Sequence, residues 1–285
     1  MATVLPPSQL GATIWDWSRT CVFGVINVTP DSFSDAGQFL DPDTAIARGL
    51  ELARLGADVL DVGGESTRPN STPVPEEEEL RRVLPVIEGL ARQCNLPISI
   101  DTYKARVARE AVAAGASVIN DISGMGLDPL MPRVMCESGA TVILGHLRGT
   151  PATMQEGVHF VDVVGEVCDE LRVVLRRAVT EGIAPDRIWF DPGIGFGKTA
   201  AQSLQLLRDA GRIREALGYP ILVGPSRKSF IGAVTGDSVE RRLMGTSASV
   251  AAVVMAGADG VRIHDVAELM PAIRVADAIR RGRLP

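Results

Sequence analysis

The sequence is poor in aromatic residues and has no excess of basic ones. Phe, Trp and Tyr make up 4% of the 285 residues, while hydrophobic residues make up 46%, which predicts a core of aliphatic side chains. The 29 basic residues are outnumbered by 35 acidic ones, and the net charge is −6. This balance argues against general binding to nucleic acid or to a membrane surface, so any anion site must be local.

Long apolar runs, paired cysteines and clustered histidines are also lacking. No stretch approaches the roughly 20 apolar residues that span a bilayer, and the amino terminus has no signal-peptide pattern. The four cysteines show no CxxC spacing, which indicates reduced thiols, and the three histidines are spaced unlike zinc ligands. These features predict a soluble protein of the cytoplasm.

Short apolar runs that end in polar or charged residues recur eight times along the chain. Helical patterns lie between them, and spacers such as Leu55-Gly56-Ala57-Asp58 join a helix to the next run. This order predicts one (β/α)8 barrel over residues 1–285, with its chemistry at the carboxyl ends of the strands. Those ends carry Asn27, Gly63 to Glu65, Asp101, Asn120 and Asp121, His146, Asp191, Ser226 to Lys228, and Arg262 to His264.

A doubly wound open sheet is the alternative fold, because it too alternates strands and helices. It would gather its ligand residues at one switch point, whereas here they follow every strand, so the barrel is preferred. Thr13–Ser18 predicts a small hairpin that caps the amino-terminal mouth, and the long connections 28–39 and 63–73 predict binding loops. The expected helices are Asp43–Leu55, Glu76–Gln93, Lys104–Ala114, Pro129–Ser138, Asp162–Glu181, Ala201–Ala210, Glu240–Ala256 and Ala267–Arg280.

The segment from Asp191 to Lys198 is rich in glycine but is no phosphate-binding loop. A P-loop needs glycine where Pro192 stands, and a dinucleotide fingerprint needs glycine where Lys198 stands. What remains is an aspartate at a strand end followed by a glycine-rich turn. A purely structural aspartate that caps this turn is the alternative interpretation.

Asp101, Asn120 and Asp191 each end a predicted strand. One amide and two carboxylates at the same barrel face suit a flat heterocycle that carries amino and amide groups, because donors and acceptors must both be matched. For Asp101 alone, capping of the helix that begins near Lys104 is the competing interpretation.

A local anion site is predicted after the last two strands. Barrels often hold phosphate there, and Arg262 and His264, two apart in an extended segment, point the same way. A surface salt bridge is the alternative for Arg262. Magnesium could bind through ligand phosphates with few protein ligands. The acidic run Glu76–Glu79 fits the first turn of a helix and is assigned no chemistry.

Taken together, these segments resemble the dihydropteroate synthase family along nearly the whole chain. No single motif is specific, but their number and order are. The segments that carry the resemblance are Asn27–Asp35, Asp61–Pro69, Ser99–Thr102, Ile119–Gly124, Asp191–Lys198, Ser226–Ser229 and Arg262–Val266.

The resemblance implies a homodimeric β/α barrel that joins 6-hydroxymethyl-7,8-dihydropterin diphosphate to 4-aminobenzoate, with Mg²⁺, and that accepts sulfonamide-type analogues. The pterin site implied by the motifs comprises Asp101, Asn120, Asp191 and Lys228. The diphosphate and Mg²⁺ site comprises Asn27, Arg262 and His264, with Arg68 as a further candidate, and the aminobenzoate site comprises Thr67, Arg68, Pro69, Phe196 and Ser229.

Two positions depart from the family pattern. Gly145 stands where a bulky apolar residue is common, which predicts a different floor for the pterin pocket, and Asn70 stands where glycine is frequent. Two other functions stay open. A methyltetrahydrofolate-using corrinoid methyltransferase would explain Asp101, Asn120 and Asp191 alone, and a catalytically silent pterin-binding paralogue would keep the site without turnover.

Overall fold

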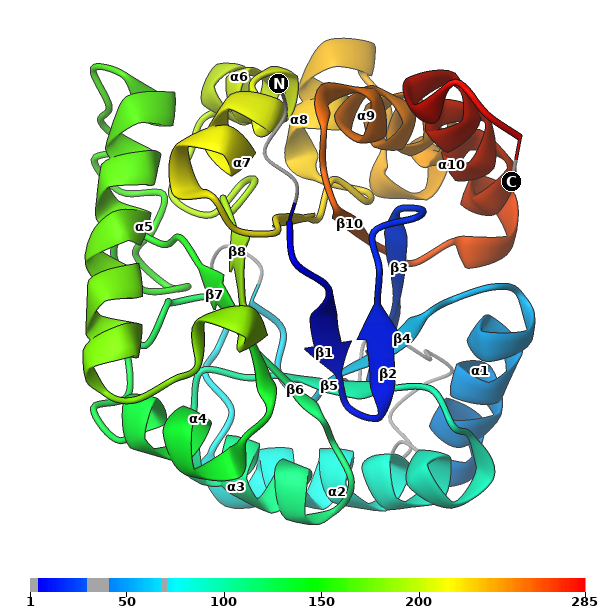
Figure 1. The fold of residues 1–285 in the computed structure, drawn as a ribbon, viewed down its shortest axis with the longest axis vertical. Helices are drawn as coiled ribbons and strands as arrows, with labels where there is room; N and C mark the ends of the chain where they lie inside the picture. Colours follow the sequence, from blue (N-terminus) through cyan, green and yellow to red (C-terminus); the bar gives the residue numbers. More distant parts are fainter. Residues whose placement is uncertain (1–4, 30–40, 68–70, 285) are drawn as a thin grey trace.

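The protein forms a closed barrel of eight parallel strands. The computed structural model describes residues 5–29, 41–67 and 71–284, and the structural statements below concern these. The ribbon shows the strands arranged around the centre of the molecule (Figure 1), in the order β8-β7-β6-β5-β4-β3-β10-β9. A parallel bridge between Phe190 and Ile221 joins the two ends of this series. This closure rules out the open sheet. The strands are β3 (Cys21–Asn27), β4 (Val59–Gly63), β5 (Ile98–Asp101), β6 (Val118–Asp121), β7 (Thr141–Gly145), β8 (Ile188–Asp191), β9 (Leu222–Val223) and β10 (Gly260–Ile263).

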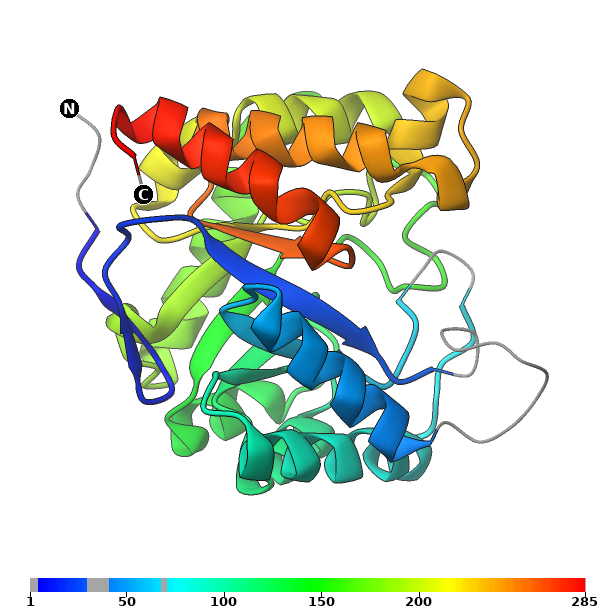
Figure 2. The same ribbon diagram turned by 90° about the vertical axis from the view of Figure 1, so that its right-hand side faces the viewer.

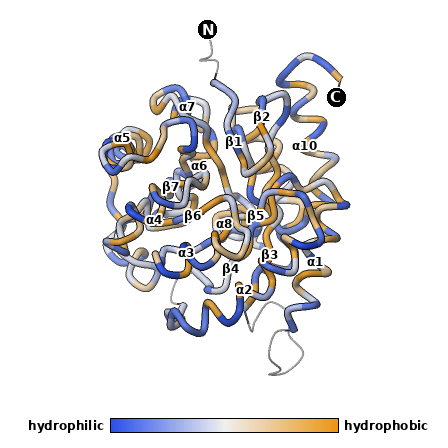
Figure 3. The backbone as a smooth tube through the Cα atoms, turned by 60° about the horizontal axis from the view of Figure 1, so that its bottom comes forward, coloured by the Kyte–Doolittle hydropathy of each residue, from blue (hydrophilic) through white to orange (hydrophobic). Residues whose placement is uncertain are grey.

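The barrel strands are buried on both faces. Every residue of β4, β6 and β7 is buried, as expected for parallel strands covered by helices outside and by side chains inside. Figure 3 shows hydrophobic colour along β3, whereas outer helices such as α5 carry hydrophobic and hydrophilic colour in turn. The aliphatic core predicted from the composition is therefore formed between the strands and one face of each helix.

Helices surround the barrel and connect successive strands. Glycine in the left-handed region ends several of them, for example Gly139 after α4 and Gly257 after α9. No helix in the described part of the chain is both long and apolar enough to cross a bilayer. The helices are α1 (Pro42–Arg54), α2 (Glu76–Gln93), α3 (Ala105–Ala113), α4 (Met131–Ser138), α5 (Val163–Thr180), α6 (Ala200–Arg208), α7 (Ala210–Leu217), α8 (Ser229–Thr235), α9 (Leu243–Ala256) and α10 (Val266–Arg281), with short 3₁₀ turns at Pro185–Arg187 and Val239–Arg241.

Two helices differ from the sequence-based prediction. The helix expected over Ala201–Ala210 stops at Arg208, and a second helix, α7, continues to Leu217 after a break at Asp209. The helix expected from Glu240 begins at Leu243, because residues 239–241 form a 3₁₀ turn. Neither difference moves a strand end, so the predicted positions of the polar residues are unaffected.

A two-stranded antiparallel hairpin closes the amino-terminal end of the barrel, as predicted. It consists of β1 (Ser8–Leu10) and β2 (Thr13–Trp15), so it begins earlier in the sequence than the alternation in Thr13–Ser18 suggested. Leu10 and Trp15 pack in one cluster with residues that begin barrel strands, and Trp189 Nε1 donates a hydrogen bond to Ser8 Oγ (2.9 Å). The hairpin lies at one end of the barrel (Figure 2), which leaves the carboxyl-terminal mouth for the site.

Candidate active site

A cavity that is partly open to solvent lies at the carboxyl ends of the barrel strands. Eight of the residues predicted from the sequence line it, although they come from segments between residues 67 and 264. The lining residues are Thr67, Asp101, Asn120, Ile122, Asp191, Ile194, Phe196, Gly224, Ser226, Lys228, Arg262 and His264.

Among the described residues, two predicted site residues, Asn27 and Ser229, are not among those that line the cavity. Asn27 ends β3 beside Gly63, which in turn pairs with Asp101. Ser229 is exposed as the first residue of α8. Arg68 and Pro69 lie outside the described residues, as do Asn70 and most of the long connection 28–39. Their roles stay predictions.

Asp101 and Asn120 are placed next to each other by strand register. Asp101 ends β5 and pairs with Asn120 of β6, so the two lie at the same level of the barrel. The helix-cap interpretation of Asp101 is wrong, because the backbone N–H of Ala105 at the start of α3 donates to Asp128 Oδ2 (2.8 Å) instead. The Asp101 carboxylate is therefore available to the cavity and to its charged neighbours.

Arg262 is held between two carboxylates below the cavity. Its Nε donates to Asp61 Oδ2 (2.6 Å) and its terminal nitrogen donates to Asp101 Oδ2 (2.5 Å). The side chain is 20% exposed and Asp61 is fully buried, so the surface salt bridge considered for Arg262 is wrong. Only one oxygen of Asp61 has a partner, since Oδ1 is buried without a hydrogen bond.

Asp61 is the functional candidate that the sequence reasoning missed. A charged residue between Leu60 and Val62, inside a strand that is buried on both faces, was the available signal. Asp61 orients Arg262, because it binds the guanidinium through Nε while the same side chain lines the cavity.

The electrostatics of this group favour a protonatable Asp101. Burial raises the pKa of Asp101 to about 7, with help from the neighbouring Asp61 carboxylate and against the attraction of Arg262. Burial opposes the charge of Arg262, but Asp61 and Asp101 outweigh it and raise the pKa of the guanidinium. The Arg262 guanidinium thus pairs with two carboxylates. Asp101, which lines the cavity, changes charge near neutral pH.

Asp191 combines the two interpretations made from the sequence. Its Oδ1 accepts a hydrogen bond from the backbone N–H of Gly193 (2.7 Å), so it does cap the glycine-rich turn. It also lines the cavity, where burial raises the pKa of its carboxyl group. A structural role and a place in the site are compatible here.

Lys228, Phe196, Ser226 and His264 also line the cavity. Lys228 Nζ lies 4.0 Å from the centre of the Phe196 ring, a cation–π contact between the connection after β9 and the glycine-rich turn. Ser226 Oγ lies 2.9 Å from His264 Nδ1. Ser226, which follows β9 in the same segment as the predicted Ser229, lines the cavity.

Gly145 explains how the floor of the cavity is built. A Cβ at this position would lie 2.5 Å from the carbonyl oxygen of Ile122 and 2.6 Å from its Cα. The turn after β6 therefore packs directly on β7, which brings Ile122 to the cavity. A bulky residue at position 145 would require this turn to move, so the departure from the family pattern has a structural consequence.

The connection from β4 to α2 is fixed at its two ends by buried charges. Glu65 Oε2 accepts from the backbone N–H of Val74 (3.1 Å), and Lys104 Nζ donates to the Val74 carbonyl (2.6 Å). Lys104 also pairs with Glu65 and with Glu79, whose side chain is 1% exposed. Glu79 does more than complement the helix dipole, because it also pairs with the largely buried Lys104.

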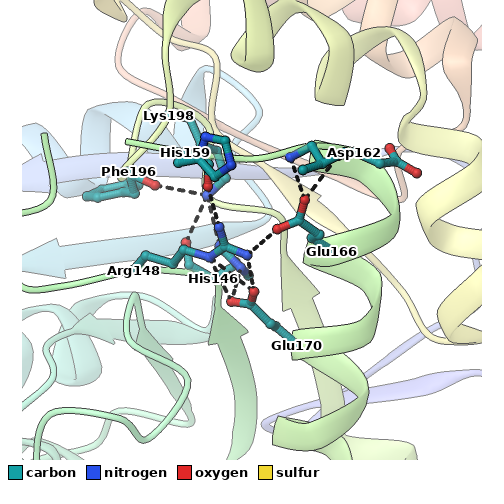
Figure 4. A network of polar contacts seen from close by, with 9 residues as sticks. His146, Arg148, His159, Asp162, Glu166, Glu170, Phe196 and Lys198 are labelled. Atoms are coloured by element: carbon teal, nitrogen blue, oxygen red, sulfur yellow. Dashed lines mark hydrogen bonds and ion pairs between the residues drawn. The ribbon is translucent and has the colours of Figure 1, made fainter. Parts of the chain in front are cut away.

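A polar network supports the glycine-rich turn from outside the cavity (Figure 4). His146 Nε2 lies 2.9 Å from Glu170 Oε2, and His146 Nδ1 lies 2.9 Å from Lys198 Nζ. Arg148 bridges Glu170 and Glu166 and lies over the Phe160 ring. His146, which ends a predicted strand run, faces this network and is not among the residues that line the cavity.

The fold and sequence are similar to those of proteins with a known reaction. The pterin-binding enzyme family matches residues 23–264. The dihydropteroate synthase of Synechocystis sp. is 44% identical over 278 residues, which cover 97% of this chain and 96% of the relative.

Solved structures agree with the sequence comparison. The dihydropteroate synthase of Yersinia pestis with a sulfonamide drug has a TM-score of 0.92 at 37% identity and covers 97% of this chain and 100% of its own. The enzyme of Xanthomonas albilineans with 4-aminobenzoic acid has a TM-score of 0.90 at 44% identity, with coverage of 97% and 98%. A structure of the same enzyme with 7,8-dihydropteroate has a TM-score of 0.87 at 42% identity, with coverage of 96% and 99%.

Proposed function

Since the chain belongs to the pterin-binding enzymes and, among them, to the dihydropteroate synthase family, we propose that it joins 6-hydroxymethyl-7,8-dihydropterin diphosphate to 4-aminobenzoate. The products are 7,8-dihydropteroate and diphosphate. The observation that carries this proposal is the convergence of Asp101, Asn120, Asp191, Lys228 and Arg262 on one cavity. The similar enzymes solved with 4-aminobenzoic acid and with 7,8-dihydropteroate support the choice of substrates.

The pterin ring is assigned to the floor of the cavity. Its amino and amide edge offers both donors and acceptors, which the Asn120 amide and the carboxylates of Asp101 and Asp191 can match. Lys228 adds a donor for a ring nitrogen or carbonyl. Ile122 and Ile194 provide apolar surface for the ring faces.

Diphosphate is assigned to the side of the cavity formed by Arg262 and His264. The guanidinium already bonds two carboxylates, so it contributes its remaining N–H groups and its charge. His264 is oriented by Ser226 and can donate through its other ring nitrogen.

Magnesium belongs to the proposal as an ion held mainly by substrate phosphates. Among residues 5–29, 41–67 and 71–284, no three His, Cys, Asp or Glu side chains gather as a metal site. This fits an ion that keeps waters and takes few protein ligands. The Asn27 amide oxygen, at the carboxyl end of β3, is the ligand we assign. When bound, magnesium neutralises charge on the leaving diphosphate.

The proposed reaction is a dissociative substitution. The bond between the pterin methylene carbon and the diphosphate oxygen breaks, and its electron pair leaves with the diphosphate. The cationic methylene is stabilised by the electron-rich ring and by the Asp101 carboxylate. The aniline nitrogen then forms the new C–N bond and releases its proton without a strong base. Diphosphate release that strictly requires 4-aminobenzoate would contradict this order.

The aminobenzoate is assigned to the outer part of the cavity. Thr67 and the Phe196 ring line it, and Ser229 at the start of α8 is proposed near the carboxylate. Arg68 and Pro69 remain candidates for the same site. Sulfonamide-type analogues are expected to compete there, as the drug complex of the Yersinia pestis enzyme suggests.

A homodimer is also proposed, through the outer face of α9 and α10. Met244 is 78% exposed on α9, and Val275 and Ile279 are 60% and 64% exposed on α10. A second copy of the chain is the partner that would cover such a face. Sedimentation of an Ile279→Glu variant tests this, since a monomer is expected there and a dimer in the unchanged protein.

One experiment tests the function directly. The purified protein is supplied with both substrates and magnesium, and dihydropteroate and diphosphate are measured. A silent paralogue would bind the pterin without turnover, and a corrinoid methyltransferase would act only with a methyl donor and a cobalamin protein. Either outcome would overturn the proposal.

A further inference from the structure

The glycine-rich turn after β8 carries part of the cavity wall but has little regular structure to hold it. Gly193, Gly195 and Gly197 all adopt positive φ angles, between 62° and 78°. Ile194 and Phe196, which alternate with them, line the cavity. The conformational freedom of three such glycines would leave these side chains poorly fixed unless another group restrained the turn.

Lys198 supplies that restraint through its contacts with His146, which follows β7, and with the turn itself. Its Nζ lies 2.9 Å from His146 Nδ1, 3.2 Å from the His146 carbonyl oxygen and 2.9 Å from the Phe196 carbonyl oxygen. An ammonium has three N–H donors, so three acceptors satisfy it completely. The side chain is almost entirely buried, between the end of β7 and the turn (Figure 4).

His146 is in turn fixed by the rest of the network. Burial lowers the pKa of His146, which favours the neutral ring. The neutral tautomer that fits its partners accepts from Lys198 at Nδ1 and donates from Nε2 to Glu170. Arg148 holds Glu170 in place from the loop after β7. Lys198 therefore anchors the turn to a rigid support.

The turn lies very close to this support. A Cβ on Gly193 would be 2.0 Å from the His146 carbonyl oxygen, so only glycine allows the approach. Burial lowers the pKa of Lys198 to about 7, while the Asp191 and Glu170 carboxylates act in the opposite direction. The buried amino group of Lys198 is held here by its acceptors, which an apolar side chain could not satisfy.

We propose that Lys198 is a positioning residue that holds the Phe196 backbone, and thereby the aminobenzoate side of the cavity, against the end of β7. This inference rests on the proposed function. It predicts an unequal effect on the two substrates. Asp191 belongs to β8 and is also held by pairing with Gly145, whereas the Phe196 carbonyl is held by Lys198. Loss of Lys198 should displace Phe196, whose carbonyl it binds, more than the pterin-site residues Asp101, Asn120 and Asp191, which lie on barrel strands.

The test compares Lys198→Met, which has similar length and no donor, with Lys198→Gln, which keeps amide donors on a shorter chain. The Michaelis constant for 4-aminobenzoate should rise about tenfold or more in the Met variant, the size expected when buried acceptors lose a charged donor. It should rise less in the Gln variant. The dissociation constant for the pterin substrate, measured by calorimetry, should rise clearly less than this Michaelis constant, because Asp101, Asn120 and Asp191 lie on strands and only Ile194 belongs to the turn.

Arg214→Met is the matched control for loss of a buried cation. Arg214 on α7 pairs with Asp259, and its side chain is 12% exposed. Asp259 precedes β10 and accepts from the Ile221 N–H, so the pair lies at the opposite end of the barrel. This variant should lose stability without changing the ratio of the two substrate affinities.

Amide hydrogen exchange gives a readout that does not depend on turnover. Exchange in residues 193–197 should accelerate in Lys198→Met and stay unchanged in Arg214→Met. Folded Lys198 variants that bind 4-aminobenzoate as the unchanged protein does, or that lose both substrates equally, would overturn the inference. If the unchanged protein makes no dihydropteroate, the proposed function fails instead, and exchange alone then decides whether Lys198 holds the turn.

Discussion

Replacement of Arg262 by methionine should destabilise the protein strongly, because one guanidinium neutralises two buried acids. Asp61 is fully buried and Asp101 is nearly so, and each bonds a different nitrogen of Arg262. Methionine fills a similar volume but removes the guanidinium that both carboxylates bond. The loss therefore reports the charge pairing more than the packing.

The size of the effect follows from burial. Removing one partner of a buried ion pair costs about 3–5 kcal/mol, because a desolvated charge is left behind. Two acids depend on Arg262, and Asp61 already has one oxygen without a partner, so we expect the upper part of that range. Since a domain is stable by about 5–15 kcal/mol in total, the variant should be marginal at neutral pH.

The pH dependence gives the mechanism its own test. In the Arg262→Met variant both carboxyl groups stay buried without the guanidinium, so the folded state disfavours their ionised forms. The loss of folding free energy is therefore largest at high pH, where both carboxyl groups are ionised in the unfolded chain. It disappears as the pH falls and both become protonated. The stability difference from the unchanged protein should shrink between about pH 7.5 and about pH 5.

Urea unfolding followed by circular dichroism measures these differences. The Arg148→Met variant is the control, because Arg148 also bridges two carboxylates but is 35% exposed, and a loss below about 1 kcal/mol is expected. Adding Asp61→Asn to Arg262→Met should recover part of the stability by removing one buried charge. An unchanged unfolding midpoint in Arg262→Met, or a loss that does not vary with pH, would refute the reasoning.

Four further predictions concern the site and its support. Since burial raises the pKa of Asp101 to about 7, kcat/KM for the pterin substrate should rise with pH up to and through that value, and Asp101→Asn should abolish this rise along with most activity. Lys228→Ala should weaken pterin binding by about tenfold or more in calorimetry, and unchanged affinity would remove Lys228 from the pterin site. Gly193→Ala should lose clearly more stability than Gly218→Ala, because both glycines have φ near 70° but a Cβ at position 218 meets nothing within 4 Å. Chelation of magnesium should stop turnover and leave the melting temperature unchanged, and a lower melting temperature would point to a protein-held metal.

The sequence predicted the barrel because the relevant signals are local. Each strand is a short apolar run, each helix has its own periodicity, and glycines such as Gly56 and Gly115 mark the returns to the sheet with φ above 100°. Parallel strands place their carboxyl ends at one mouth, so the gathering of Asp101, Asn120 and Asp191 followed from the fold class alone.

Breaks inside helices were less predictable. The interruption at Asp209 and the late start of α9 at Leu243 depend on how neighbouring helices pack, and their periodic patterns run across the boundaries. These errors changed no strand end.

Only the tertiary structure decided which charges pair. Arg262 was predicted as an anion clamp, but its partners are 161 and 201 residues away, and no local pattern connects Asp61 to it. The same holds for Lys198, which a motif comparison treats as the end of a glycine-rich loop and the structure places on His146. Local propensity determines where a residue lies on the barrel. The three-dimensional surroundings determine which opposite charge or acceptor compensates its burial, because that free energy depends on neighbours brought together by folding.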